Sequence, residues 1–448
     1  MSERPDYVRD TIVAAATPPG RGGIGIVRIS GAEAGTIGKR MLGELPQPRY
    51  ATSATFRDAK GEPVDSGIAL YFPEPNSFTG ESVLELHGHG GPVVMSLLVD
   101  AACALGARRA GPGEFSQRAF LNGKLDLAQA EAIADLIDSG TGQAARAAHR
   151  SLSGAFSAAV DTLAEQLIRL RMHVEAALDF PEEEIDFLSD HELLNEIGRA
   201  QSSFAALRER TAVGRVLRDG FRVVIAGKPN AGKSSLLNYL SGQEAAIVTE
   251  VAGTTRDILR ERIDFDGLAV ELVDTAGLRD DPDRIEAEGI RRAREALGSA
   301  DAALWIEDAT TAEVTRPSVP DGIPVLRLRN KIDVSGDAPG AVSGEKDCLN
   351  VSARTGAGID ALKSALRELA GYRDLGEGAF TARRRHLEAI AAAERHFNAG
   401  RDALEHDRAG EIFAEELRLS QAALGEITGE VTADDLLGRI FSEFCIGK

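Results

Sequence analysis

Apolar residues recur every three or four positions in the stretch 125–218, which is the spacing of the buried face of a helix. Two such sets are Ala130, Ile133, Ala134 and Ile137, and Leu163, Leu167, Leu170 and Val174. Helix-rich sequence returns after about Gly371, and Thr432, with Asp435 three residues on, is placed to cap the last helix. Neither helical block looks complete alone, so we expect the two blocks to pack together around whatever lies between them.

The middle of the chain carries short apolar runs that predict β-strands. The runs are 221–226, 268–273, 325–329 and 349–351. The first leads into residues 227–234, Gly-Lys-Pro-Asn-Ala-Gly-Lys-Ser, and then into a predicted helix. This is a phosphate-binding loop in its strand–loop–helix context. Backbone N–H groups and the helix N-terminus wrap the phosphates, Lys233 bridges the terminal ones and Ser234 reaches Mg²⁺.

Two segments further along fit the terminal phosphate. Residues 249–257 read Thr-Glu-Val-Ala-Gly-Thr-Thr-Arg-Asp, a polar segment suited to folding around a γ-phosphate. After the second strand, Asp274 can hold the Mg²⁺ shell, and Gly277 leaves room for its N–H to approach the γ-phosphate.

The last two strands lead into segments that identify the base. Asp333 ends an Asn-Lys-x-Asp element, and its carboxylate can accept hydrogen bonds from guanine N1–H and N2–H₂, donors that adenine lacks. All the elements in order predict a GTP-binding domain inserted between the helical blocks. The residues expected to bind GTP are Asn230, Ala231, Gly232, Lys233, Ser234, Ser235, Thr249, Glu250, Val251, Ala252, Gly253, Thr254, Thr255, Asp274, Thr275, Ala276, Gly277, Asn330, Lys331, Asp333, Ser352, Ala353 and Arg354.

Hydrolysis needs a different catalyst here from the glutamine of Ras-like enzymes, because that position is Leu278, which cannot orient water. Glu286 is a candidate for positioning water, although the residues alone slightly favour a solvated carboxylate on an acidic switch helix. Asn230 lies where an arginine finger would otherwise enter. Its amide oxygen, helped by carbonyls of 249–254, could hold a monovalent cation, or it could simply shape the loop.

Composition narrows the partners and the compartment. The net charge of −19 opposes indiscriminate nucleic-acid binding, although a local basic patch remains open. The three cysteines are too few and too scattered for a disulfide framework or a zinc site. No apolar run approaches the roughly 18 residues of a membrane span. We therefore expect a cytoplasmic protein with no membrane association.

Motifs near both ends of the chain resemble the MnmE (TrmE) family of bacterial tRNA-modification GTPases. They are residues 10–23 (Asp-Thr-Ile-Val-Ala-Ala-Ala-Thr-Pro-Pro-Gly-Arg-Gly-Gly), 77–81, 85–91, 112–116, 120–127 and the terminal Phe-Cys-Ile-Gly-Lys at 444–448. The resemblance covers the full length of the chain.

The resemblance implies a multidomain fold. An α+β folate-binding and dimerisation domain would span 1–123, and an all-α helical domain would combine 124–216 with 375–448. An inserted α/β Ras-like P-loop GTPase domain would span 217–374.

The resemblance also implies the activity. A potassium-dependent GTPase, acting as a homodimer with a flavoprotein of the MnmG (GidA) type, would install a (carboxymethyl)aminomethyl group on C5 of the tRNA wobble uridine. The one-carbon unit would come from a tetrahydrofolate derivative of the 5-formyl or methylene type. By motif, K⁺ would be held by Asn230, Thr249, Val251 and Thr254, Mg²⁺ by Ser234 and Thr255, and Glu286 would match the catalytic glutamate.

Folate would contact Arg28, Glu85, Lys124 and Lys448 by the same resemblance, whereas the residues alone favour Arg28 and Glu85 as ordinary strand residues. A carboxylate such as Glu85 can accept the paired N–H donors of a pterin, and the glutamate tail of folate needs cations. His87 and His89 lack further partners in the sequence and are expected to be loop residues rather than metal ligands. Cys445 is a tentative catalytic nucleophile, and a chemically silent small residue is the alternative.

Five arginines could form a tRNA-backbone patch or a solvated helix surface, and the sequence slightly favours the second. They are Arg146, Arg150, Arg383, Arg384 and Arg385. Two alternative functions also remain. One is a switch-type GTPase for ribosome assembly or signalling without modification chemistry, and the other is a folate-dependent aminomethyltransferase with a regulatory GTPase domain.

Overall fold

The computed structural model describes residues 10–179, 191–228, 230–243, 260–274, 298, 300–311, 322–372, 378–430, 434–442 and 444–447. The chain divides into two compact units, Met1–Ala134 with Gln421–Lys448, and Asp135–Ser420. Helices α4 (Leu127–Ile137) and α13 (Gly410–Thr428) each continue from one unit into the other. Within the described residues, none of the helices combines the length and apolar character needed to cross a bilayer.

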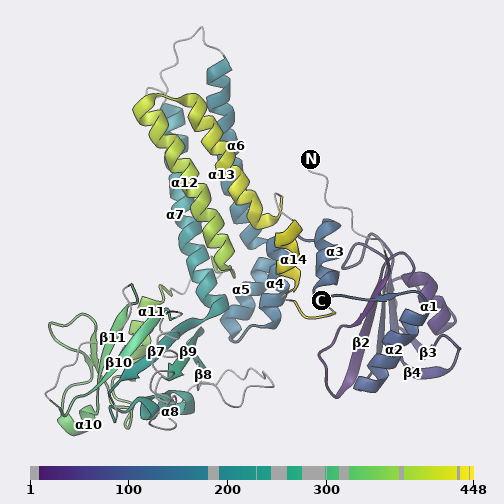
Figure 1. The fold of residues 1–448 in the computed structure, drawn as a ribbon, viewed down its shortest axis with the longest axis horizontal. Helices are drawn as coiled ribbons and strands as arrows, with labels where there is room; N and C mark the ends of the chain where they lie inside the picture. The colour runs from purple at the N-terminus through teal and green to yellow at the C-terminus, as the bar shows by residue number, and fades with distance from the viewer. Residues whose placement is uncertain are drawn as a thin grey trace, which may run out of the picture. The chain divides into compact units, whose positions relative to one another are not determined.

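The first unit is built on a six-stranded sheet of order β3-β4-β5-β2-β1-β6 (Figure 1). Its strands are β1 (Ile12–Ala15), β2 (Gly22–Ser30), β3 (Thr52–Arg57), β4 (Pro63–Phe72), β5 (Val83–Gly90) and β6 (Arg108–Arg109). Neighbouring strands are antiparallel except β1 and β6. Alternate residues such as Val27, Ile29, Leu84 and Leu86 point into one core, where α1 (Ala34–Leu42) and α2 (Pro92–Ala104) cover the sheet.

The first unit also contains an apolar cluster formed by helices outside the sheet layer. Helix α3 (Glu114–Leu121), the start of α4 and the C-terminal helix α14 (Asp434–Ser442) share an apolar cluster that includes Phe120, Leu127, Phe441 and Phe444. Packing of the C-terminal residues on α3 and α4 anchors the end of the chain in this unit. The predicted cap at Thr432 lies outside the described residues.

The second unit joins long helices to a seven-stranded sheet of order β12-β13-β11-β10-β7-β9-β8. The helices are α5 (Gly142–Leu152), α6 (Ala155–Asp179), α7 (His191–Asp219), α8 (Lys233–Gln243), α10 (Ile332–Ser335), α11 (Ile359–Leu369), α12 (Arg384–Asp407) and the first part of α13. The strands are β7 (Phe221–Gly227), β8 (Arg260–Phe265), β9 (Leu268–Asp274), β10 (Ala302–Asp308), β11 (Val325–Asn330), β12 (Gly340–Ala341) and β13 (Cys348–Asn350). The five strands from β13 to β9 run parallel, and β8 and β12 are antiparallel edges.

The helices that precede this sheet in the sequence pack against those that follow it, as the sequence predicted. Phe204 on α7 lies 5.3 Å, centroid to centroid, from Phe397 on α12. The apolar set on α6, from Leu163 to Val174, is buried as predicted. On α4 the prediction is wrong for Ile137, which is 54% exposed because it is the last residue of its helix. The predicted division into three domains, with the helical domain built from 124–216 and 375–448, stays a prediction.

Candidate functional site

The phosphate-binding loop lies between β7 and α8, where the sequence placed it. A side chain at Gly227, whose φ is 147°, would bring a Cβ within 2.3 Å of the Ile306 carbonyl oxygen on β10. Only glycine lets the loop leave the sheet this close to a neighbouring strand. Asn230 adopts a left-handed φ of 63° and is exposed at the turn of the loop.

Lys233 occupies the centre of the loop. Its side-chain Nζ donates to the carbonyl oxygens of Gly227 at 2.9 Å and Lys228 at 2.8 Å, and the residue is buried. The ammonium group is therefore held at the mouth of the strand–helix turn, where the helix N-terminus adds its own positive potential. An anion at this position would meet both charges.

Asn330, in the Asn-Lys-x-Asp segment, is hydrogen-bonded to the phosphate-binding loop and to residues 352–354. It is 2% exposed, its Nδ2 donates to the Ala231 carbonyl at 2.9 Å, and its Oδ1 accepts from the Ala353 N–H at 3.0 Å. A Cβ on Gly232 would lie 2.2 Å from the Asn330 Nδ2. The sequence placed Asn330 among ligand contacts, whereas the structure makes it the bridge between the loop, β11 and residues 352–354.

The Asp333 carboxylate is oriented by its neighbours. Its Oδ1 accepts from the Ser352 hydroxyl at 2.7 Å, and Oδ2 lies 3.5 Å from the Arg354 Nε. Arg354 is 82% exposed, so this second contact is weak. The arrangement fixes one carboxylate oxygen and leaves acceptor capacity for a ligand.

Asp308 belongs to the same end of the sheet and was missed in the sequence. Its Oδ2 lies 2.6 Å from the Lys331 Nζ. Hydrogen bonds from Lys331 and Thr310 lower the pKa of Asp308 to about 2. The signal was available, because Asp308 ends β10, and the carboxyl ends of parallel strands meet at one edge of a sheet.

Several predicted site residues lie outside the described residues. They are Thr249, Glu250, Val251, Ala252, Gly253, Thr254, Thr255, Thr275, Ala276, Gly277, Leu278, Glu286 and Lys448. For Asp274 the structure describes the backbone, which ends β9 beside the phosphate-binding strand β7. Ser234 and Ser235 begin α8 and are exposed.

A second cluster lies on the face of the first sheet opposite α1 and α2. Arg28 on β2 faces Glu85 on β5, and the Arg28 Nε and Nη2 lie 2.9 and 2.8 Å from the Glu85 Oε1. The guanidinium also lies over the rings of Phe78 and Phe115, 5.4 and 5.7 Å from their centroids. The predicted pair Arg28 and Glu85 is therefore brought together.

Lys124 approaches the same loop that carries Phe78. Its Nζ donates to the Pro75 carbonyl at 2.9 Å, and a Cβ on Gly80 would meet the Lys124 Cγ at 3.3 Å. Arg28 and Lys124 therefore both contact segment 75–80.

The C-terminal tail docks at the adjoining end of β1. The Gly113 N–H donates to the Cys445 carbonyl at 3.3 Å, and Ile446 forms a β-bridge with Pro112. A Cβ on Gly447, whose φ is 97°, would approach the Ala15 carbonyl oxygen to 2.2 Å. Ala14 and Ala15 pair with Arg28 and Val27, so the tail ends within one strand of the Arg28–Glu85 pair. Cys445 is exposed.

The expectation that His87 and His89 are loop residues is wrong, because both lie on β5. His87 Nε2 lies 3.1 Å from the Glu85 Oε2, and His89 Nδ1 lies 2.8 Å from the Asp65 Oδ1. Glycines at 88, 90 and 91 disguised the strand in the sequence. Among the described residues, no group of three or more His, Cys, Asp or Glu side chains could hold a metal ion.

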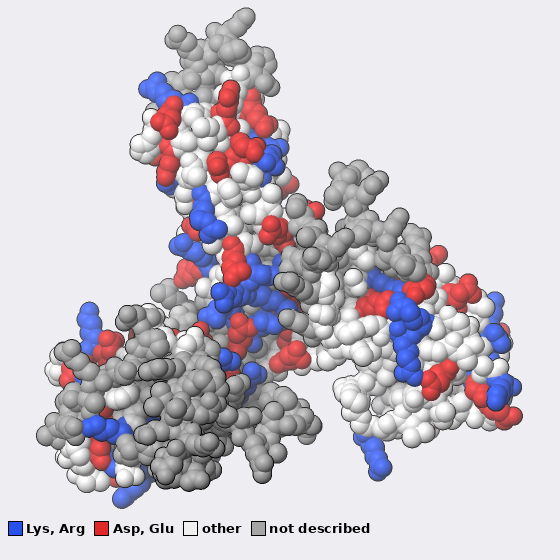
Figure 2. Space-filling model, viewed as in Figure 1, with Lys and Arg blue, Asp and Glu red and all other residues white. Residues whose placement is uncertain are grey.

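Two of the arginines considered for an RNA patch serve the fold instead. The Arg383 side chain is 10% exposed and pairs with Asp135 at 2.9 Å. The Arg150 Nε donates to the Ala379 carbonyl. A nearby cavity of about 710 Å³ is lined by a mixture of other arginines and acidic residues. Figure 2 shows positive and negative side chains interspersed near the ends of α7 and α12. Arg383 is therefore part of neither an exposed tRNA-backbone patch nor the solvated helix surface that the sequence slightly favours.

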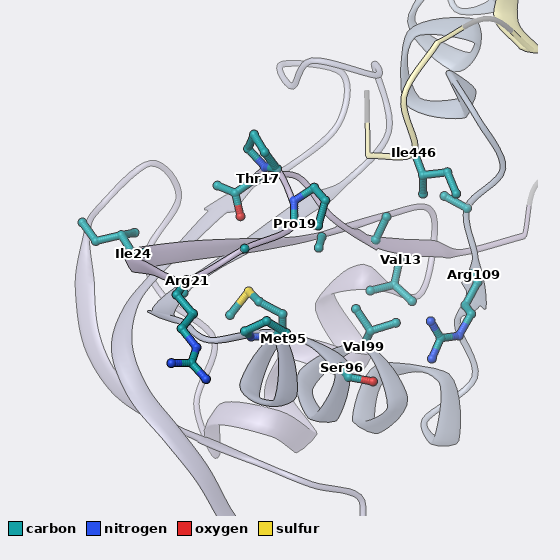
Figure 3. Close-up of a pocket in the computed structure, with 18 residues that line it drawn as sticks. Val13, Thr17, Pro19, Arg21, Ile24, Met95, Ser96, Val99, Arg109 and Ile446 are labelled. Atoms are coloured by element: carbon teal, nitrogen blue, oxygen red, sulfur yellow. The ribbon is translucent and has the colours of Figure 1, made fainter. Parts of the chain in front are cut away.

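A cavity of about 700 Å³ opens on the helix-covered side of the first sheet. Figure 3 shows Arg21 and Arg109 on either side of Met95, Ser96 and Val99 from α2. Ile446 from the tail forms part of the wall. Arg28 and Glu85 do not line this cavity.

The parallel sheet, its phosphate-binding loop and the Asn-Lys-x-Asp segment after β11 define a Ras-like P-loop GTPase fold. Residues 127–445 match the family model "MnmE helical domain", and residues 11–124 match "GTP-binding protein TrmE N-terminus".

Two proteins named tRNA modification GTPase MnmE are each 54% identical to the chain over 451 residues. They come from Yersinia pestis bv. Antiqua (strain Angola) and Yersinia pseudotuberculosis serotype IB (strain PB1/+), and the matches cover 98% of this chain and 99% of each relative. The chain belongs to the MnmE family, and it is a GTP hydrolase that takes part in tRNA modification. Among solved structures, it is similar to a single-residue variant of Aquifex aeolicus Era bound to GDP·AlF4⁻, at 26% identity over 40% of this chain and 67% of that chain, with a TM-score of 0.26.

Proposed function

We propose that this GTPase installs a (carboxymethyl)aminomethyl group on C5 of the tRNA wobble uridine, together with a flavoprotein partner of the MnmG type and a folate one-carbon unit. The observation that carries the proposal is the pairing of two folate-site candidates, Arg28 on β2 and Glu85 on β5, while residues 445–447 dock on the adjoining strand β1. We place the protein in the cytoplasm as a homodimer with three domains: the folate-binding domain 1–123, the helical domain 124–216 with 375–448, and the inserted GTPase domain 217–374.

The nucleotide site would use the loop 230–235 for phosphates and Asp333, with residues 352–354, for guanine. Ser234 and Thr255 would hold Mg²⁺, with Asp274 in its outer shell, and Glu286 would position water. Ser234 fits this role because it begins α8 next to the buried Lys233. A hydroxyl at a helix start beside a phosphate-binding loop is a suitable oxygen ligand.

Asn230, Thr249, Val251 and Thr254 would hold K⁺. Amide, carbonyl and hydroxyl oxygens are the donors that replace the hydration shell of K⁺, and the exposed, left-handed Asn230 turns the loop at the required place. When bound, the ion supplies positive charge beside the phosphates, where an arginine finger contributes about 10³–10⁵ in rate.

Hydrolysis is expected to be at least about 10-fold faster in KCl than in NaCl at equal ionic strength. Phosphate release is measured with saturating GTP, and GTP binding in both salts is the control. Asn230→Ala should shrink the difference between the salts without abolishing binding. Equal rates in the two salts would remove potassium from the proposal.

Folate would contact Arg28, Glu85, Lys124 and Lys448. The described members fit, because the Glu85 carboxylate keeps an acceptor position for a pterin N–H donor, and Arg28 and Lys124 offer cations around segment 75–80. Cys445 would take part as a nucleophile only if its thiol reaches the uridine, and a silent role is the alternative.

The modification itself is tested by mixing the full chain, the flavoprotein, tRNA, GTP and a reduced folate. Mass spectrometry of the digested nucleosides should show the modified wobble uridine only when every component is present. In cells, deletion of the gene should remove the modification. Intact modification after deletion would instead favour a switch-type GTPase without modification chemistry.

A further inference from the structure

The Glu85 carboxylate is engaged on both oxygens from two directions. Arg28 places its Nε and Nη2 on Oε1, whereas His87 places its Nε2 3.1 Å from Oε2. Glu85 and His87 are two residues apart on β5, so their side chains leave the same face of the sheet. The side chains of Glu85 and His87 are 15% and 24% exposed, which leaves the cluster accessible to a ligand.

Counting acceptor sites shows where a ligand can bind. An ionised carboxylate offers about four lone-pair positions and donates nothing. Two positions on Oε1 face the two Arg28 donors, and His87 takes one on Oε2. The remaining position is on Oε2, beside His87. His87 must carry its proton on Nε2 to make this bond, in either its neutral or its charged form.

We propose that His87 is a positioning residue that holds the remaining acceptor position of the Glu85 Oε2 toward an N–H donor of a ligand, such as the pterin ring of a folate. This inference rests on the folate site of the proposed function. His87 fixes the rotation of the carboxylate through the oxygen that Arg28 does not bind, so the ligand meets an acceptor that is already oriented. Without this bond the carboxylate can turn about its Cγ–Cδ axis, and binding must then order it.

The same strand supplies a matched control. His89 also pairs with a carboxylate, but its partner is Asp65 rather than Glu85, and its side chain is 73% exposed. Replacing His89 makes the same substitution on the same strand as replacing His87, but removes no hydrogen bond to the Glu85 carboxylate.

The experiment titrates the full chain with 5-formyltetrahydrofolate by calorimetry. His87→Leu removes the donor at similar volume and is expected to raise Kd about 5- to 20-fold. His87→Gln, which keeps an N–H donor at comparable reach, should restore Kd to within about 3-fold of the unmodified chain. His89→Leu should leave Kd unchanged. p-Aminobenzoylglutamate, which lacks the pterin, should bind the His87→Leu variant and the unmodified chain equally.

Glu85→Gln separates this inference from the folate site itself. Unchanged folate binding in Glu85→Gln would overturn the site and the proposed function with it. Loss of binding in Glu85→Gln combined with a normal Kd in His87→Leu would overturn only the role of His87. Equal losses in His87→Leu and His87→Gln would assign His87 to packing and also overturn it. If leucine prevents folding, His87→Ser replaces it, because serine cannot reach the Glu85 Oε2.

Discussion

Replacing Asp333 with asparagine is expected to weaken GTP binding about 10³-fold or more and to create a preference for xanthosine triphosphate. The Asp333 Oδ1 already accepts from the Ser352 hydroxyl at 2.7 Å, so the carboxylate is held in one orientation. An ionised carboxylate accepts both guanine donors, whereas an amide keeps one acceptor and turns an N–H₂ group toward the other donor. Xanthine carries a carbonyl at that position and would pair with the amide. Competition of the two nucleotides for a fluorescent GTP analogue measures the change.

Asp337→Asn is the matched control for this substitution. Asp337 lies four residues on, pairs with Arg329 at 3.2 Å and with Ser335, and is partly exposed. The control makes the same charge change close to the site without touching the Ser352–Asp333 pair. Unchanged guanine selectivity in Asp333→Asn would show that another group reads the base.

The fold of the GTPase portion could be predicted because its motifs are local. The phosphate-binding loop, its entering strand and its leaving helix are contiguous in the sequence, and backbone geometry alone places Lys233 at the centre of the loop. Periodicity likewise located α6, because a helix buried along one face repeats its apolar residues.

Side-chain bridges between distant segments could not be predicted from the same signals. Asn330 joins the loop to residues 352–354, and Arg383 reaches Asp135 over 248 positions. Each pairing forms only when the fold brings two distant segments together, and no local pattern in the sequence shows which segments those are. His87 and His89 were not assigned to the strand of Glu85, because the glycines beside them weaken the β-pattern, whereas in the structure pairing with β2 and β4 extends the strand through them.

Some residues of the motifs that resemble the family form ion pairs that hold the fold together. Glu81 and Glu114, from segments 77–81 and 112–116, both bind Arg118, whose side chain is 2% exposed. Asp10 completes the cluster, with its Oδ1 2.7 Å from the Arg118 Nη2. The cluster joins the start of β1, segment 77–81 and α3, so a motif shared with a family can reflect packing rather than chemistry.

Replacing Arg118 with methionine is expected to lower the free energy of unfolding by about 3–5 kcal/mol, because it removes the buried cation that Asp10, Glu81 and Glu114 share. Arg108→Met is the matched control. Arg108 binds Asp10 and Glu114 at 2.7 Å each but is 50% exposed, so its loss should cost about 1 kcal/mol or less. Urea denaturation followed by circular dichroism measures both variants. Similar decreases in the free energy of unfolding of the two variants would contradict the claim that the buried Arg118 contributes more stability than the exposed Arg108.

The pH dependence of the same variants tests the origin of the effect. Hydrogen bonds from Arg108, and then from Arg118, hold the pKa of Asp10 below its usual value. Burial raises the pKa of Glu114, but bonds from Arg108, Gly111 and Arg118 outweigh burial and leave that pKa lowered. A carboxylate with a lowered pKa stabilises the folded state above its unfolded pKa of about 4, and this stability is lost as the pH falls through the folded pKa. The unmodified chain should therefore lose stability as the pH falls below about 5, whereas Arg118→Met should lose less, because the pKa values of Asp10 and Glu114 are then lowered by Arg108 without Arg118. A deficit between the two proteins that stays constant from pH 7 to pH 3 would show that Arg118 acts through packing instead of charge.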